Sequence, residues 1–185
     1  MEPEPLTGRL LVATPVLGDP NFDRTVVLVL EHGAEGAVGL VLNRPSGTDV
    51  AEPLPEWDPV AATPSVIFVG GPVAQSAVIG LARGPLGGEG PGWRPLVGRV
   101  GIVDLAPGPY DLAMPIEALR LFAGYAGWGA GQLEGEIEAG AWWVVDADPA
   151  DALGPDPERL WTEVLRRQPL PLALYAHYPA DPSTN

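Results

Sequence analysis

The chain of 185 residues has a formal net charge of −14 at pH 7 and a hydrophobic fraction of 46%, which favours one acidic domain with a sizeable core. All ten cationic residues are arginines; the absence of lysine and cysteine excludes Schiff-base chemistry, phosphate-binding lysines, disulfides, thiolate nucleophiles and cysteine-based zinc sites. The arginines are scattered among 24 acidic residues, which argues against nucleic acid as a direct partner, because phosphate neutralisation needs clustered cations.

The N-terminal segment predicts neither secretion nor membrane insertion. Glu2 and Glu4 precede the first arginine, so the segment lacks the basic start and the long apolar core of a signal peptide. Apolar runs elsewhere are shorter than the roughly 18 residues of a membrane-spanning helix. We therefore expect a cytoplasmic protein that has no membrane partner.

Two apolar runs, residues 9–14 and 24–32, are rich in Val and Leu and too short for buried helices, so they predict strands. The second run lacks alternation, which is typical of a strand covered on both faces. Turn residues separate the two runs at 15–23. The segment GAVGLVLNRP follows after a short Gly-rich link, so residues 24–42 predict an antiparallel hairpin.

The next part of the chain is interrupted by prolines. Val50, Leu54, Trp57 and Ala61 have helical spacing, but the prolines between them would break a long helix, so residues 46–63 predict a broken helical segment.

A further pair of strands is expected after this segment. Residues 65–73 predict a strand that ends in a Gly-Gly-Pro turn, and residues 76–83 are its expected hairpin partner. The glycine-rich residues 84–98 predict a mobile loop that carries Trp93, and residues 99–105 return to a strand.

The second half predicts most of the helices. Residues 115–127 open with a proline and place Ile116, Leu119 and Phe122 three apart, which indicates an amphipathic helix stopped by glycine. Residues 132–138 predict a short acidic helix.

The last part of the chain predicts a strand and a helix. In the strand at 141–147, alternate residues point to two faces that are both apolar. Asp156-Pro157-Glu158 starts the helix, and the tail from Pro169 has too many prolines for one. Hairpin strands with helices gathered in the second half indicate an α+β fold.

One candidate for acid–base chemistry joins the ends of two expected strands. Glu31, His32, Asn43 and Arg44 would form a cluster there if the strand register allows it. The competing interpretation, which we favour, is that His32 and Asn43 are turn residues that satisfy backbone groups at strand ends.

Acidic and glycine-rich segments supply the other candidates. Glu134, Glu136 and Glu138 could bind a divalent cation, but a solvated acidic face explains them better. Gly70-Gly71 could cradle an anion through backbone N–H groups, although no phosphate-loop pattern is present and the negative charge opposes it. No metal or cofactor is therefore predicted. Trp128, between two glycines, is either a gap-filling residue or a contact residue.

Four segments of the sequence resemble the YqgE/AlgH family of bacterial proteins: GRLLVATPVLGDPNFDRTVVLVLEH, GAVGLVLNRP, FVGGPV and LRLFAGYAGWGAGQLEGEIEAGAWWV. The resemblance covers residues 6–168, which we expect to form one domain between terminal extensions at 1–5 and 169–185. It implies an α+β fold in which a mostly antiparallel, split sheet curls into a partial barrel with helices packed around it. It also implies a cytosolic bacterial protein.

The resemblance supplies no catalytic residues, and members of this uncharacterised family are often labelled transcriptional regulators although no DNA-binding motif is recognisable. The leading hypothesis is a non-enzymatic protein that binds another protein or a small ligand, with a regulatory role. The candidate contact surface comprises Asn43, Arg44, Gly70, Gly71, Trp128, Gln132 and Glu134. The alternative is an enzyme or a divalent-metal-binding domain that uses Glu31, His32, Asn43 and Arg44, or the acids at 134–138.

Overall fold

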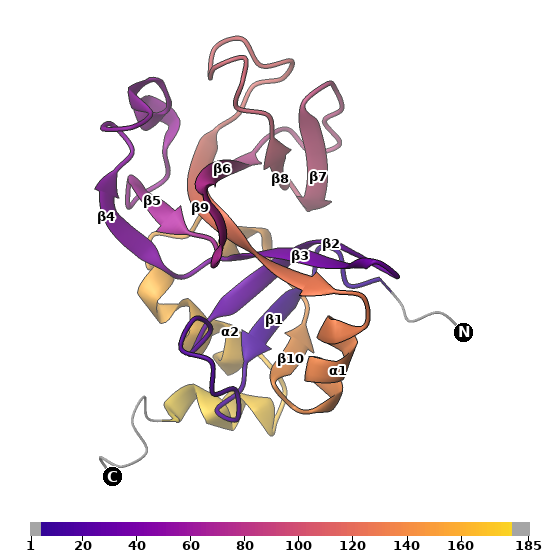
Figure 1. The fold of residues 1–185 in the computed structure, drawn as a ribbon. Helices are drawn as coiled ribbons and strands as arrows, with labels where there is room; N and C mark the ends of the chain where they lie inside the picture. The colour runs from indigo at the N-terminus through magenta and orange to yellow at the C-terminus, as the bar shows by residue number, and fades with distance from the viewer. Residues whose placement is uncertain (1–4, 179–185) are drawn as a thin grey trace.

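One long strand, β9 (Ala118–Gly129), organises the computed structural model, which describes residues 5–178 (Figure 1). The C-terminal end of β9 pairs with β3 (Gly36–Val41). Further back, β9 pairs with β5 (Val66–Val69) on one edge and with β6 (Val73–Arg83) on the other. The strand therefore belongs to both halves of a ten-stranded sheet.

The first half of the sheet has the order β10-β1-β2-β3, and all of its pairings are antiparallel. It consists of β1 (Leu10–Ala13), β2 (Val26–Gly33), β3 and β10 (Trp142–Val145). The expected hairpin of β2 and β3 is confirmed. Both strand predictions for the N-terminal apolar runs are also confirmed.

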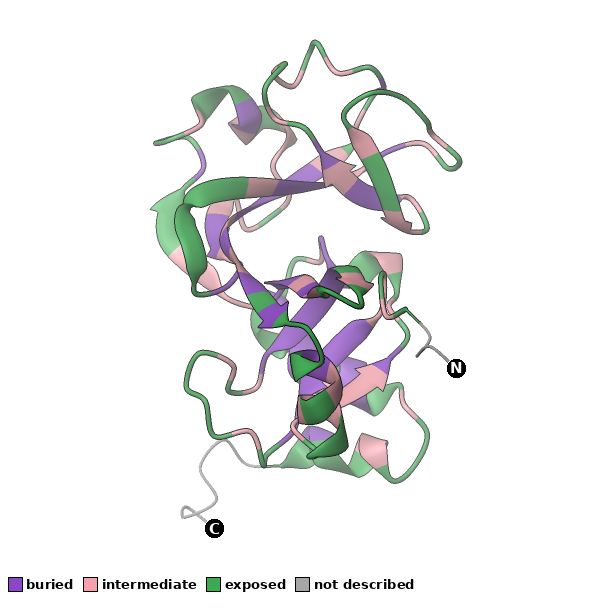
Figure 2. Cartoon of the chain, turned by 45° about the vertical axis from the view of Figure 1, so that its right-hand side comes forward, coloured by how far each residue is buried: buried purple, intermediate pink, exposed green. Residues whose placement is uncertain are grey.

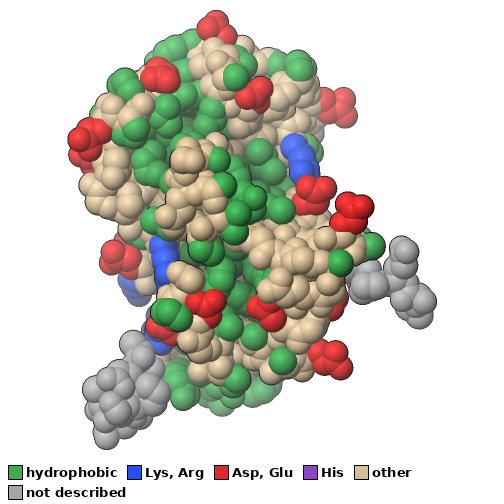
Figure 3. Space-filling model, viewed as in Figure 1, with side chains coloured by type: hydrophobic (Ala, Val, Ile, Leu, Met, Phe, Trp, Pro, Cys, Tyr) green, Lys and Arg blue, Asp and Glu red, His purple; other side chains and the backbone are tan. Residues whose placement is uncertain are grey.

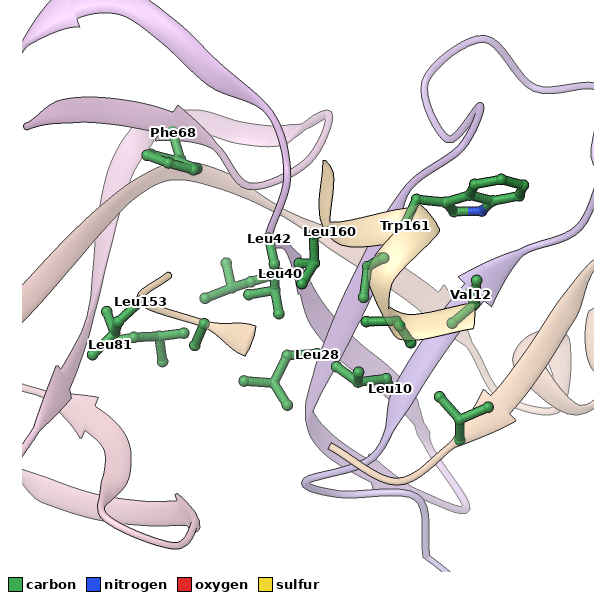
Figure 4. Packing of buried hydrophobic residues seen from close by; sticks show 14 of the residues in the cluster. Leu10, Val12, Leu28, Leu40, Leu42, Phe68, Leu81, Leu153, Leu160 and Trp161 are labelled. Atoms are coloured by element: carbon green, nitrogen blue, oxygen red, sulfur yellow. The ribbon is translucent and has the colours of Figure 1, made fainter. Parts of the chain in front are cut away.

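Successive residues of β1 and β2 belong to different core clusters, because side chains alternate across a sheet. Leu10 and Leu28 face helix α2 (Leu160–Arg166), as Figure 4 shows. Leu11 and Val27 face the other side of the sheet, where Trp128 of β9 and Trp142 of β10 pack. The prediction that β2 is covered on both faces is thus confirmed. The prediction that both faces of β10 are covered is also confirmed, because Trp142 and Trp143 pack in different core clusters.

The second half of the sheet curls over the first, so that the whole forms the expected half-barrel (Figures 1 and 2). It contains β4 (Pro45–Asp49), β5, β6, β7 (Trp93–Val97) and β8 (Val100–Val103). Strand β5 runs parallel to β9, and the other pairings are antiparallel. The prediction of a mostly antiparallel sheet curled into a partial barrel is confirmed.

Two of the expected helices are present as α1 (Gln132–Glu138) and α2, although α2 is preceded by a 3-10 turn, η3 (Pro157–Arg159). The other 3-10 turns are η1 (Pro55–Val60), η2 (Pro149–Asp151) and η4 (Leu172–His177). None of the helices in residues 5–178 is long and apolar enough to cross a membrane.

The prediction of a helix over residues 115–127 is wrong, because this segment forms most of β9. Leu119, Leu121 and Phe122 are fully buried although they do not share a helix face. A run of buried residues on both faces is typical of a strand in the interior of a sheet. The three-residue spacing of Leu119 and Phe122 imitated a helical stripe in a strand that has partners on both edges.

Three further expectations are corrected by the pairing. Strand β5 pairs with β4 and β9, so β6 is not its hairpin partner. Residues 84–98, expected to form a loop, contain β7, which pairs with β8. The expected broken helix at 46–63 divides into β4 and η1. The C-terminal tail holds the 3-10 turn η4; residues 1–4 and 179–185 of the expected terminal extensions lie outside the described residues.

A buried arginine on β9 connects two loops, one before and one after β9 in the sequence, to the middle of the sheet. Arg120 is 2% exposed, and its guanidinium donates hydrogen bonds to the carbonyls of Ala152, Thr63 and Gly154 at 2.7–3.1 Å. It also lies over the ring of Phe68, 4.4 Å from the ring centre. Burial lowers the pKa of Arg120 to about 10, so the guanidinium is charged at neutral pH.

Candidate functional site

A groove of about 440 Å³ lies where β4, β5, β9 and β6 adjoin one another. Its apolar lining comes from Ile67 and Val69 of β5, Ala123 of β9 and Val78 of β6, with Leu54 at one side. Ile67 and Val69 point the same way because they are two residues apart on one strand. Phe68, between them, points to the opposite side and joins the main core.

No lining residue of this groove is charged, although the chain has a net charge of −14. The polar groups in the lining are Ser46, Thr48 and Gln75, all of them neutral. In Figure 3, apolar side chains gather between the β4–β5 region and β6, and the acidic side chains of this face lie around them. A hollow with these properties can accept an uncharged apolar group.

The first half of β6, beside the groove, is incompletely paired. Val73 is opposite Tyr125 and Val78 is opposite Ala123, so residues 74–77 bulge out with no partner on β9. Strand β8 joins β6 only from Gly80 onward. Figure 2 shows this part of β6 as exposed, and Val73 and Val78 are 38% and 39% accessible.

A second hollow, of about 470 Å³, lies at the β2–β3 turn and includes His32, Glu31, Glu35 and Trp128 among its lining residues. The His32 side chain is only 3% exposed. The backbone N–H of Leu6 donates to its Nδ1 at 3.0 Å, and its Nε2 bonds to the Glu134 carboxylate. An Nδ1 atom that accepts must be unprotonated, so Nε2 carries the proton and donates it to Glu134.

The acids of α1 hold this helix against the sheet. Glu134 bonds to His32, and a single oxygen of Glu136 accepts the indole N–H groups of Trp128 at 3.4 Å and Trp142 at 3.2 Å. Gln132 accepts a hydrogen bond from the backbone N–H of Gly129 at 2.9 Å, which fixes the junction between β9 and α1. Gln132, Glu134 and Glu136 therefore each make a hydrogen bond that fixes α1 to the sheet.

Trp128 lies on strand β9, and not after the end of the helix expected over residues 115–127. It is 7% exposed and packs edge-on against Trp142, with ring centres 6.1 Å apart, and against Phe22. Its polar N–H is directed to Glu136. The structure therefore favours the gap-filling interpretation of Trp128.

Asn43 and Arg44 lie at the other end of the β2–β3 hairpin from His32, as the pairing of Val27 with Val41 and of His32 with Ala37 requires. Asn43 accepts from the backbone N–H of Val26 at 3.0 Å and donates to the carbonyl of Arg24 at 2.9 Å. It satisfies backbone groups at a strand end.

Arg44 fixes the segment that precedes β2. Its guanidinium donates to the carbonyls of Pro20 and Asp23 at 3.2 and 3.1 Å. The acid–base cluster considered for Glu31, His32, Asn43 and Arg44 does not form, because the hairpin separates its members.

Gly70 and Gly71 are places where two backbones approach closely. A Cβ on Gly70 would lie 2.4 Å from the carbonyl oxygen of Gly124, and one on Gly71 would lie 2.1 Å from the carbonyl carbon of Tyr125. Gly71 has a φ of 155°. This packing against β9 accounts for both glycines without an anion.

The sequence candidates thus form two separate groups. Asn43, Arg44, Gly70 and Gly71 lie near the start of β4 and the end of β5, whereas Trp128, Gln132 and Glu134 lie with His32 at the β9–α1 junction. Neither group lines the apolar groove. Within residues 5–178, no set of three or more His, Asp or Glu side chains is placed to hold a metal ion.

Sequence reasoning missed the groove because its lining residues are ordinary apolar or small polar types. They come from β4, β5, β6 and β9, and the pairing that brings them together includes the two strands whose partners were misassigned. The exposure of Val73 and Val78 on β6, which marks the border of the groove, becomes visible only in the structure.

The pairing of His32 with Glu134 predicts a specific pH dependence of stability. The hydrogen bond from His32, with a smaller contribution from a backbone N–H, lowers the pKa of Glu134 below its value in the unfolded chain. A carboxyl with a lowered folded-state pKa stabilises the fold above the unfolded-state pKa of about 4.3, and this contribution is lost as pH falls through the folded-state value. In Glu134→Gln, stability should therefore be reduced near pH 6 and should fall less steeply below pH 4.

Urea unfolding at a series of pH values measures this effect. Glu138→Gln on the same helix is the control, because none of the side-chain hydrogen bonds of the described residues involves Glu138. Equal pH profiles for the two variants would contradict the assignment of the pair.

Comparison with known proteins is consistent with this architecture over nearly the whole chain. A family model described as AlgH-like matches residues 10–173. A UPF0301 protein of Streptomyces coelicolor is 55% identical over 184 residues, which cover 97% of this chain and 95% of that protein. A UPF0301 protein of Mycobacterium tuberculosis is 48% identical over 181 residues, with 96% and 90% covered.

Two solved structures share the fold. Protein DIP2367 from Corynebacterium diphtheriae aligns with a TM-score of 0.88 at 35% identity, covering 96% of this chain and 95% of that one. The solution structure of the AlgH protein from Pseudomonas aeruginosa, also labelled UPF0301, aligns with a TM-score of 0.70 at 34% identity and covers 97% of each chain. The resemblance noted in the sequence is confirmed: the chain belongs to the AlgH-like family.

Proposed function

We propose that this protein is a non-enzymatic, cytoplasmic binding protein and that its apolar groove holds an uncharged ligand or partner segment. The observation that carries the proposal is the complete absence of charged residues from the groove lining in a strongly acidic chain. Its volume of about 440 Å³ falls within the range of roughly 300–1,000 Å³ of small-molecule sites. A regulatory role would then follow from ligand-dependent contacts with other proteins, without direct DNA binding.

The contacts of the other candidates support a non-enzymatic role. Both ring nitrogens of His32 are engaged, and Asn43 and Arg44 are bonded to backbone carbonyls. A general base needs a free acceptor within hydrogen-bond distance of its substrate, and His32 has none in this arrangement. The binding function therefore requires no rearrangement, whereas catalysis at His32 would require α1 or the Leu6 segment to move.

The test is NMR with the ¹⁵N-labelled full chain and two matched sets of small molecules. One set contains neutral aromatic and aliphatic amides, and the other contains the corresponding carboxylates. We expect the neutral set to shift the amide signals of β5, β6 and the middle of β9, and the carboxylates to have little effect because the surrounding acids repel them.

Val78→Asp is expected to weaken binding of the neutral set by about tenfold or more, since it places a charge in the apolar lining. Val16→Asp is the matched control: it makes the same change at a 76% exposed valine outside the groove. Binding of the neutral set that is unaffected by Val78→Asp would contradict the proposed function.

A further inference from the structure

The incomplete pairing of β6 indicates what kind of occupant the groove accepts. Residues 74–77 have no strand partner on β9, and β8 pairs with β6 only from Gly80 onward. Ala74 has a φ of 48°, in the left-handed region that non-glycine residues rarely adopt. The bulge therefore turns a short stretch of backbone away from the sheet at the border of the groove, where Gln75 and Val78 belong to the lining.

Unpaired backbone on a strand attracts another strand, and native proteins usually protect such positions with charges, proline or bulges. The stretch Val73–Val78 contains a bulge but no charge and no proline: its sequence is VAQSAV, and its two valines are more than a third exposed. An exposed, uncharged strand segment of this kind is an interaction site or an aggregation site. Because a net charge of −14 opposes self-association of this chain, the segment is best explained as an interaction site.

We infer that the groove receives an extended, uncharged peptide segment of a partner protein, which adds as a strand beside residues 74–77 of β6. This inference rests on the proposed function and specifies its ligand. In strand addition, main-chain hydrogen bonds supply affinity and alternate side chains enter pockets. In this groove, every second side chain of the peptide would be apolar and would contact Ile67, Val69 and Ala123. The neutral side chains of Ser46, Thr48 and Gln75 would contact polar groups of the peptide.

Charge argues against two other occupants, and the unpaired backbone of residues 74–77 argues against a third. A second copy of the chain would bring another −14 charges to the site, and mutual repulsion opposes that approach. A charged peptide would leave its charge unpaired in a groove whose lining has none. A small apolar molecule fits the volume but leaves the backbone of residues 74–77 unpaired.

The test uses capped eight-residue peptides attached singly to a surface, with Val, Ile or Leu alternating with Ser, Thr or Gln. The labelled full chain is expected to bind a subset of them. Methylation of backbone nitrogens on one set of alternate residues should weaken binding by about tenfold or more, because those N–H groups face β6. Methylation on the other set should change it by less than about twofold, because those groups face away.

Val78→Asp should abolish the peptide binding and Val16→Asp should preserve it. Equal sensitivity to both methylation patterns, or binding unaffected by Val78→Asp, would overturn strand addition. If neutral small molecules bind in a Val78-dependent way but no peptide does, the proposed function stands and this inference fails. If neither class binds, both fail.

Discussion

Replacing Arg120 by methionine is expected to lower the free energy of unfolding by about 3 kcal/mol or more, because the buried guanidinium is the donor to three backbone carbonyls. Arg120 donates to Thr63, Ala152 and Gly154, which belong to two loops on either side of β9 in the sequence. Methionine fills a similar volume, so the loss reports the hydrogen bonds more than a cavity. Urea unfolding monitored by tryptophan fluorescence gives the value.

The matched control is Arg159→Met, because Arg159 is exposed on the surface and its side chain forms a 3.8 Å ion pair with the exposed Glu163. Exposed pairs of this kind contribute roughly 0–1 kcal/mol, so this variant should be close to the unchanged protein. A loss for Arg120→Met no larger than that for Arg159→Met would contradict the structural role of the buried guanidinium. Arg120→Lys should be nearly as unstable as Arg120→Met, since a lysine ammonium group cannot reach three divergent carbonyls.

The second large effect is expected at Gly71. A Cβ there would lie 2.1–2.4 Å from backbone atoms of Tyr125 and Ala126, and backbone cannot move aside as a flexible side chain can. Its φ of 155° adds strain for any other residue. Gly71→Ala should therefore destabilise the protein by roughly 2–4 kcal/mol, since steric overlap and backbone strain add.

Gly135→Ala provides the opposite control. Gly135 lies inside α1, and a Cβ on it would meet nothing within 4 Å. Alanine is favoured over glycine in a helix by roughly 0.5–1 kcal/mol, so this variant should be more stable. Thermal unfolding of both variants decides the matter: if Gly71→Ala is tolerated as well as Gly135→Ala, the close approach of the two backbones is wrong.

Much of the fold could be predicted from patterns confined to one segment. The buried apolar runs of β1 and β2 and the Asp-Pro-Glu start before α2 each reflect local requirements, and each prediction is confirmed. The alternation of Trp142 and Trp143 predicted two covered faces for the same reason. Such patterns predict structure well because they depend only on which residues of a single strand or helix are buried.

The errors have a different origin. Residues 119–122 of β9 are all buried, on both faces of the strand, so their periodicity carries no information about helix or strand. The partner of β5 depends on a parallel pairing with a strand far along the chain, which no local pattern encodes. The groove and the pairing of His32 with Glu134 could not be predicted for the same reason.

The pairing of β1 with β10 also affects when the N-terminal strand can complete its folding during synthesis. Leu10 is opposite Val145, so one edge of the N-terminal strand stays open during synthesis until β10 has left the ribosome. Strand β9, which joins the halves of the sheet, also emerges late. Contacts between segments so distant in sequence slow folding and leave apolar strands exposed in the nascent chain. The growing chain is therefore most open to capture by chaperones before β9 and β10 appear.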